Sequence, residues 1–368
     1  MKSLIDSTDP ALLRLAHPLR CAAVSETFDI MERFVGPAVW ERMRVAFQED
    51  RLTSEIVSDL CAKRENAALK MMLEASTQMA GGTEVGNAYS SLLYLRHAMC
   101  PQPYFVVEDS LVEMLENSDI ADDIPIEMIQ VPYGRFYVEL GKERKTTLQL
   151  PNTVSGQHIL EGAYIERGVN AVMGEGLFIL LTGSPIGKEG VMDDATHSLF
   201  LPLKAGYETI REALGATFKL GHEISLEHGL TLTPDFFKQH AFASVQFLVK
   251  VLLYLALPEA RSTVHKDRTT WVKSTASLQS PAKKAKAAKR GRGLVDHILV
   301  SVPANAGSTD ASTPTGRTLK FGWRRRHFRM QAHGPKHSLR KMILIEETTV
   351  RRDLRPEDRG EAPVYKVK

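Results

Sequence analysis

Two prolines, Pro101 and Pro103, divide the sequence into a part with helical periodicity and a part built from short extended runs. Before them, apolar residues recur at helical spacing over three segments, residues 9–48, 53–80 and 84–99. Proline removes a backbone donor and clashes with the preceding turn, so a helix cannot continue through this pair. Residues 1–100 are therefore predicted to form a helical N-terminal region.

After Pro103 the pattern changes to short β-type runs separated by Gly, Asp and Pro turns. The predicted strands are residues 104–107, 132–140, 162–165, 177–182 and 198–203, and the predicted helices are residues 108–117, 207–220 and 234–257. Regular β-α-β alternation is absent, which excludes a doubly wound sheet. The predicted fold class is α+β: the helical N-terminal region, then a mixed, mainly antiparallel sheet with packed helices over residues 101–260, then a basic C-terminal segment.

Residues 261–318 are predicted to be a basic, flexible linker. Lys/Arg-rich stretches and a Ser/Thr/Pro/Gly/Ala-rich stretch flank one apolar run, residues 294–302, which alternates well enough to be an extra strand. The stretch KKAKAAKRGR at residues 283–292 is interpreted as a solvated, disordered segment that contacts nucleic acid nonspecifically.

Charge is distributed unevenly along the chain. Residues 281–368 contain 21 Lys or Arg and 8 Asp or Glu, a net charge of 21 − 8 = +13. The whole chain carries only +3, which leaves 3 − 13 = −10 for the first 280 residues. This asymmetry indicates an anionic partner at the C-terminal end, nucleic acid or a ribosomal surface, with a solubilising tail as the alternative.

Within the basic C-terminal segment, residues 319–368, the sequence WRRRHFRMQAHGP at residues 323–335 interleaves cations, imidazoles and aromatic rings. Such a composition suits binding a polyanion while stacking on flat groups. The predicted nucleic-acid or ribosome-binding residues are Trp323, Arg324, Arg325, Arg326, His327, Phe328, Arg329, Gln331, Arg340 and Lys341. Strand alternation would place Arg325, His327, Arg329 and Gln331 on one face and Arg326, Phe328 and Met330 on the other.

The histidines of this segment carry the enzymatic alternative. His327 with His333 or His337 is the candidate proton-transfer pair of a metal-independent RNase, because imidazole titrates near neutrality and arginine stabilises a phosphorane. The same histidines could form a metal cluster, but their cationic neighbours depress histidine basicity and disfavour a divalent metal. Binding is therefore preferred to catalysis, and no catalytic residue is predicted outside this alternative.

Two other motifs fail as cofactor or metal sites. GSPIGKE at residues 183–189 is one residue shorter than a phosphate-binding loop, and Glu189 replaces the hydroxyl that would hold magnesium, so a hairpin turn is predicted. His222 and His228 are six residues apart and cannot lie on one helical face as zinc ligands. We predict no cofactor and no metal.

Cysteine usage and hydropathy indicate a cytoplasmic protein with no membrane partner. Cys21, Cys61 and Cys100 show no CxxC spacing and are interpreted as reduced thiols. The longest apolar stretch, residues 245–257, is too short for a membrane span of about 20 residues.

Ordered short motifs carry a resemblance to a known family. They are LLYL at residues 92–95, YFVVE at 104–108, VPYGRFYVE at 131–139, LLYLALPE at 252–259 and the Trp/Arg/His motif with its trailing apolar run. Across residues 88–350 the chain resembles a phage- and plasmid-borne anti-CRISPR family that acts on type V-A systems. The resemblance implies a protein of the bacterial cytoplasm that lowers nuclease production, recognising the nascent N-terminal peptide and promoting destruction of its message at the ribosome.

The residues suggest where such a peptide would bind. An aromatic, half-exposed strand at residues 133–137 beside Tyr104 could form a peptide groove or an edge for strand addition. The predicted peptide-binding residues are Tyr104, Tyr133, Arg135 and Tyr137, and the alternative is that these aromatics fill the core. The predicted function is an anti-CRISPR-like binding protein; the alternatives are the RNase and a nucleic-acid-binding regulator with no peptide target.

Overall fold

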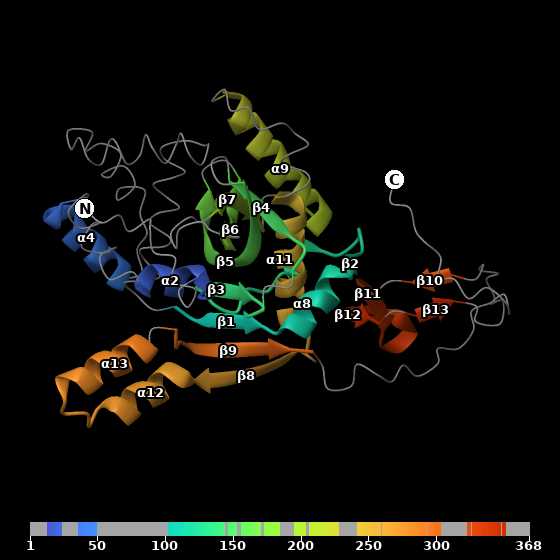
Figure 1. Ribbon diagram of the computed structural model, residues 1–368. Helices are drawn as coiled ribbons and strands as arrows, with labels where there is room; N and C mark the ends of the chain where they lie inside the picture. Colours follow the sequence, from blue (N-terminus) through green and yellow to red (C-terminus); the bar gives the residue numbers. More distant parts are fainter. Residues whose placement is uncertain are drawn as a thin grey trace.

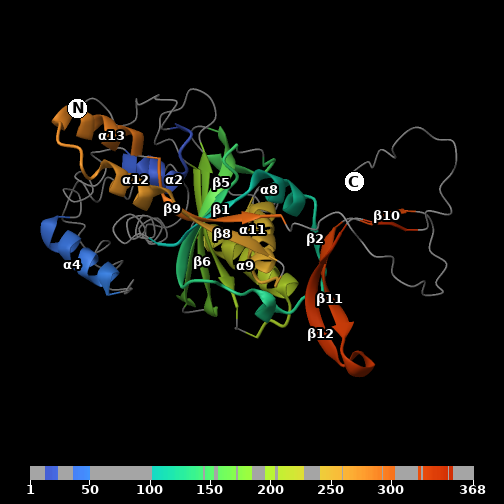
Figure 2. The same ribbon diagram turned by 90° about the horizontal axis from the view of Figure 1, so that it is seen from below.

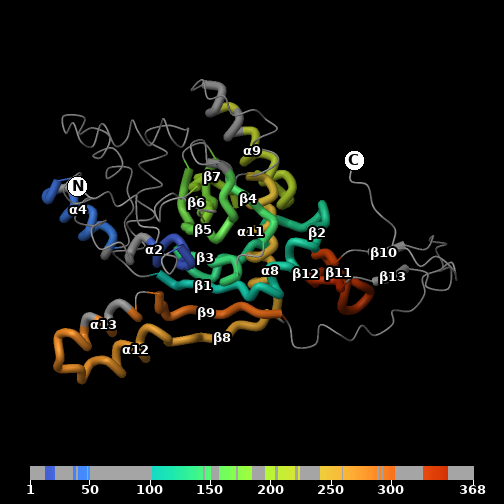
Figure 3. The backbone as a smooth tube through the Cα atoms, viewed as in Figure 1, coloured from blue at the N-terminus to red at the C-terminus, as the bar shows by residue number. Residues whose placement is uncertain are grey.

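The fold is known from a computed structural model (Figures 1 and 3). It describes residues 13–23, 36–49, 102–143, 146–152, 156–170, 173–184, 195–203, 206–227, 241–258, 260–291, 293–302, 322–324, 326–346 and 348–350. The predicted α+β class is confirmed: a mixed sheet of eight strands and seven helices occupy these ranges.

The N-terminal part contributes two of the described helices, α2 (His17–Ala23) and α4 (Pro37–Gln48). Pro37 stands in the first turn of α4, where its missing N–H costs no hydrogen bond. The helical prediction for residues 1–100 is confirmed for these two segments alone. The helices expected over residues 53–80 and 84–99, and with them Cys61 and Cys100, lie outside the described residues.

The central sheet is mixed and mainly antiparallel, as predicted. Its strands are β1 (Tyr104–Val107), β3 (Arg135–Leu140), β4 (Gln149–Asn152), β5 (Gly156–Asn170), β6 (Gly174–Ser184), β7 (Ala195–Pro202), β8 (Arg261–Lys266) and β9 (Asp296–Ser301). The order is β7-β6-β5-β3-β1-β9-β8, with β4 added beside β5. Strand β1 runs parallel to both β3 and β9, and the other pairings are antiparallel. The long connection through residues 108–134 allows β3 to return parallel to β1.

Helices cover one face of this sheet: α8 (Asp109–Glu116), α9 (Ile210–Glu227) and α11 (Ala243–Leu255) (Figure 2). Alternate strand residues such as Phe105, Val107 and Val138 enter this core. Lys250 is also buried there, and its Nζ donates a 2.9 Å hydrogen bond to the carbonyl of Leu115 near the end of α8. An ammonium group suits this position because helix C-termini carry partial negative charge.

None of the described helices is both long and apolar enough to cross a membrane. The helix predicted over residues 234–257 is confirmed from Ala243 onward, and residues 228–240 lie outside the described part of the chain.

Residues 261–302 are not a linker, and the prediction of a flexible segment is wrong there. Strand β9 pairs with β1, β8 pairs with β9, and two helices, α12 (Asp267–Thr275) and α13 (Pro281–Gly291), connect them. Residues 283–291 of the stretch expected to be disordered lie in α13, because alanine and lysine are both good helix formers. The extra strand predicted over residues 294–302 is confirmed as β9, whose Val300 is fully buried.

The C-terminal part adds two small sheets. Strands β10 (Gly322–Arg324) and β13 (Thr348–Val350) pair with each other. Strands β11 (His327–His333) and β12 (Leu339–Ile345) form a hairpin, and the short β2 (Asp119–Ile120) pairs with the base of β11. Two 3-10 turns complete the described elements, η2 (Ile126–Met128) and η4 (Pro335–His337). Figure 2 shows the hairpin projecting from the main body, with η4 at its tip.

Candidate peptide site and candidate nucleic-acid interface

The face of the sheet opposite α11 carries a row of three tyrosines. Tyr104 of β1, Tyr137 of β3 and Tyr164 of β5 occupy paired positions on adjacent strands. Neighbouring ring centroids are 5.2 Å and 4.7 Å apart, and each residue is at most 3 % exposed. Strand alternation explains the row, because Phe105 and Phe136 point into the other core. We call these three residues the tyrosine row.

Space for the tyrosine row comes from Gly162 in β5. A Cβ atom on this residue would lie 2.4 Å from the Tyr137 hydroxyl oxygen and 2.4 Å from the carbonyl oxygen of Val138. The pairing of β5 with β6 shifts register between Leu160 and Gly162. Such an irregularity re-aims neighbouring side chains, and Glu161 is buried at this position, 1 % exposed.

Each hydroxyl of the tyrosine row is hydrogen-bonded. Tyr104 donates to Glu139 Oε2 at 2.8 Å, Tyr137 bonds to Thr182 Oγ1 at 2.9 Å, and Tyr164 bonds to His17 Nδ1 at 2.8 Å. Burial, followed by the charge of Glu139, raises the pKa of Tyr104 well above its ordinary value. Burial, followed by the charge of Glu161, does the same to the pKa of Tyr137. These phenols therefore stay neutral near pH 7 and act as hydrogen-bonding groups.

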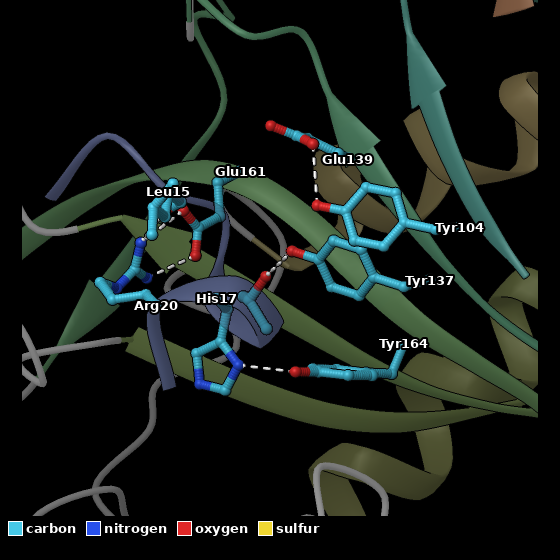
Figure 4. Close-up of polar contacts among 9 residues, drawn as sticks. Leu15, His17, Arg20, Tyr104, Tyr137, Glu139, Glu161 and Tyr164 are labelled. Atoms are coloured by element: carbon cyan, nitrogen blue, oxygen red, sulfur yellow. Dashed lines mark hydrogen bonds and ion pairs between the residues drawn. The ribbon is translucent and has the colours of Figure 1, made fainter. Parts of the chain in front are cut away.

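Helix α2 covers the tyrosine row (Figure 4). The guanidinium of Arg20 makes two hydrogen bonds to Glu161, Nη1 to Oε2 at 3.1 Å and Nη2 to Oε1 at 2.6 Å. The two side chains are 0 % and 1 % exposed. Arg20 Nη1 also donates to the carbonyl of Leu15, and the His17 ring meets the Tyr164 ring edge-on at 5.7 Å.

The chain's own residues 13–23 thus lie on this face as a short peptide held by side chains. A bidentate arginine–carboxylate pair fixes both position and orientation. A buried charge left without its partner is costly, so Glu161 requires a cation whenever this face is covered.

The structure corrects part of the predicted peptide site. Tyr104 and Tyr137 lie together but are buried beneath α2. Tyr133 is 44 % exposed and lies outside the tyrosine row. Its ring centroid is 5.9 Å from that of Phe105. Arg135 is half-buried, with its Nε 3.3 Å from Gln102 Oε1. Strand addition at β3 is excluded because β1 and β5 already occupy both of its edges.

Sequence reasoning missed the residues that complete this site: His17, Arg20, Glu139, Glu161 and Tyr164. Glu139 and Glu161 have apolar residues beside them in the runs FYVEL and ILEGAYI, and a carboxylate in such a run indicates a buried partner. The partner of Glu161 is 141 residues away in sequence, so local spacing could not identify it.

The predicted nucleic-acid interface is corrected at two positions. Phe328 is 0 % exposed and belongs to the main core, so it offers no stacking surface. Arg326 pairs with Glu346, its Nε lying 2.8 Å from Oε2. Met330, predicted to share a strand face with Arg326 and Phe328, also packs against this core.

The other predicted interface residues differ in accessibility. Arg340 and Lys341 are exposed on β12, while His327, Arg329 and Gln331 are half-buried on β11. Trp323 and Arg324 belong to β10, and Arg325 lies outside the described residues.

The geometry also contradicts the RNase alternative. His327 and His333 occupy the two ends of β11 and are about 20 Å apart at the usual rise of a strand. His337 lies beyond His333, in the turn at the hairpin tip. Neither can share one phosphate with His327 as acid and base. Among the described residues, no three His, Cys, Asp or Glu side chains gather as a metal site.

Comparisons with known proteins place the chain in a family. The crystal structure of AcrVA2 aligns with a TM-score of 0.46 at 12% identity, covering 91% of this chain and 99% of that one. No curated protein sequence matches. The model of the AcrVA2-like family, described as the anti-CRISPR type V subtype A2 family, matches residues 105–352, more than half of the sequence. The chain belongs to this AcrVA2-like anti-CRISPR family.

Proposed function

We propose that this antagonist of type V-A CRISPR immunity recognises a nascent or N-terminal peptide of its target and promotes loss of the encoding mRNA at the ribosome. Family membership supports the antagonism. Peptide recognition rests on one observation: the tyrosine row already holds a peptide segment, residues 13–23, through a buried ion pair and a histidine–tyrosine hydrogen bond.

The chemistry of this face defines the peptide that fits it. If α2 leaves, Glu161 and Glu139 face the incoming ligand, and a buried carboxylate needs a cation. A nascent N-terminal peptide can supply one as a lysine or arginine side chain, and a free α-amino group is a further source. The tyrosine hydroxyls supply hydrogen bonds to its backbone. In this proposal α2 and the target peptide compete for one surface.

Contact with RNA or the ribosome remains part of the proposal. Of the predicted C-terminal residues, Arg340 and Lys341 are exposed cations on β12 and are the ones to which this role is assigned.

Competition between α2 and the target peptide can be tested by substituting Arg20 and Glu161 separately. We expect Arg20→Ala to tighten binding of a synthetic peptide copied from the start of a type V-A nuclease, because it releases α2. We expect Glu161→Gln to weaken binding of the same peptide, because it removes the cation's partner. Glu127→Gln, at an exposed position in η2, is the matched control and should leave affinity unchanged. Titration calorimetry measures all four proteins.

A purely structural ion pair predicts a different result: both variants would weaken binding in parallel with their loss of stability.

The proposed loss of the target's mRNA needs its own measurement. Nuclease transcript levels should fall in cells expressing the protein when the nuclease start codon is intact, and should not fall when the N-terminal peptide is frame-shifted. Unchanged transcripts together with copurification of the assembled nuclease would contradict this step.

A further inference from the structure

A strongly basic part of the described chain has no role in either site above. Residues 261–291 contain nine Lys or Arg and a single acidic residue, Asp267, a net charge of 9 − 1 = +8. Helices α12 and α13 form a helical hairpin at one end of the molecule, opposite the β11–β12 hairpin (Figures 1 and 2). We call residues 267–291 the α12–α13 arm.

Three cations of α13 form a row on one side of the helix. Lys283, Lys286 and Arg290 are spaced i, i+3 and i+7, which places them on a common face, and all three are exposed. At 1.5 Å per residue the row is about 10.5 Å long, which is about three steps of a nucleic-acid strand at 3.4 Å each. Within the described part of the chain, no carboxylate lies within ion-pair distance of these three side chains.

The arm holds this row in place through contacts at its base. Arg268 Nη1 donates a 2.9 Å hydrogen bond to the carbonyl of Gly291, the last residue of α13. The indole of Trp271 lies against Gly291, where a Cβ atom would be 2.6 Å from the indole nitrogen. The backbone N–H of Thr269 donates to Asp296 Oδ1 at 2.9 Å and so joins α12 to β9. A fixed row loses less conformational entropy on binding than a disordered basic tail.

The chemistry of the row favours one class of partner. Four of the other eight residues of α13 are alanine, whose short side chains do not keep a polyanion at a distance. Single-strand binders stack bases on exposed aromatic rings. The arm's aromatic residue, Trp271, is instead half-buried against α13. A cation row with no stacking platform matches the backbone of a duplex, which is recognised through its phosphates.

We propose that the α12–α13 arm binds duplex nucleic acid through its phosphates, with Lys283, Lys286 and Arg290 as the contact row. The binding is independent of base sequence and strongly dependent on salt. It does not depend on the proposed peptide recognition, and its site is separate from both the tyrosine row and the cations of the β11–β12 hairpin.

The test is fluorescence anisotropy of labelled duplexes of about 20 base pairs, one RNA and one DNA, titrated with the full-length protein at several salt concentrations. The variant is Lys283→Ala/Lys286→Ala/Arg290→Ala, which keeps good helix formers in α13. We expect affinity to fall about tenfold or more near 0.1 M salt, and the slope of log K against log salt to become shallower by about 3. The RNA and DNA duplexes show which source of phosphate is preferred.

A second variant with the same loss of charge, Lys142→Ala/Arg211→Ala/Lys219→Ala, removes exposed cations that lie outside the arm and outside the residues assigned to peptide or RNA contact. For this control variant, we expect the slope of log K against log salt to stay close to that of the wild-type protein. Far-UV circular dichroism checks that both variants retain their helices. Unchanged affinity and slope in the arm variant would overturn the proposal. Tighter binding of single-stranded RNA than of the duplex, or equal competition by polyglutamate, would overturn the assignment to duplex nucleic acid.

Discussion

At the scale of single residues, the tyrosine row shows how burial sets protonation. Tyr104 and Tyr137 are buried among carboxylates, and both factors disfavour a phenolate. Their raised pKa values keep them as hydroxyl groups over the whole physiological range. In the proposed function, such a surface would recognise a peptide through hydrogen bonds and through a cation that pairs with its carboxylates.

The raised pKa values predict how stability changes at alkaline pH. The unfolded chain releases these two protons near pH 10, while the folded protein retains them to higher pH. The stabilising contribution is therefore complete below about pH 10 and is lost as pH rises toward the folded pKa values. We expect the free energy of unfolding, measured in urea, to fall above about pH 10. The double variant Tyr104→Phe/Tyr137→Phe should show a smaller fall, and an equal fall would contradict this assignment.

At the scale of elements, β3 and β5 approach closely because Gly162 has no side chain. Gly162→Ala would place a methyl group against the Tyr137 hydroxyl and the Val138 carbonyl, each 2.4 Å from the new Cβ. The backbone carbonyl cannot move aside, so we expect a loss of about 1–3 kcal/mol in the free energy of unfolding.

The same substitution in α9 provides the control. Gly215 is exposed within the helix, and a Cβ atom there would meet nothing within 4 Å. Gly215→Ala should stabilise by about 0.5–1 kcal/mol, because alanine has the higher helix propensity. Urea denaturation compares the two variants, and equal effects would show that the contact at Gly162 relaxes without cost.

Elements with a clear local period could be predicted from the sequence. The short β-type run at residues 104–107 predicted β1, the alternation of aromatic and polar residues predicted β3, and the apolar spacing predicted α8 and α11. Helix α13 was missed because its composition is that of a solvated segment, although alanine and lysine favour a helix once contacts at its base hold it. Phe328 was misassigned because a polar neighbourhood in sequence conceals a buried position in a strand.

At the scale of the whole molecule, polar contacts connect the N-terminal helix α2 with strand β5. The partners are far apart in the sequence, so local spacing could not predict these contacts. Arg20 and Glu161 are 141 residues apart and connect the N-terminal helix to the middle of the sheet. His17 and Tyr164 make a second connection across 147 residues. Residues 13–23 therefore complete the sheet face that carries the candidate peptide site, although they lie more than 140 residues from their partners in β5.

A double-mutant cycle measures how strongly Arg20 and Glu161 depend on each other. Removing one partner leaves the other charge buried without this ion pair, so Arg20→Met and Glu161→Met should each cost about 3–5 kcal/mol in the free energy of unfolding. The double variant replaces both charges with apolar side chains and leaves neither unpaired, so it should cost much less than the sum of the two. Additive losses would mean that the two side chains do not interact and that α2 does not rest on the sheet in solution. In that case the tyrosine row would be open to a peptide without competition from residues 13–23.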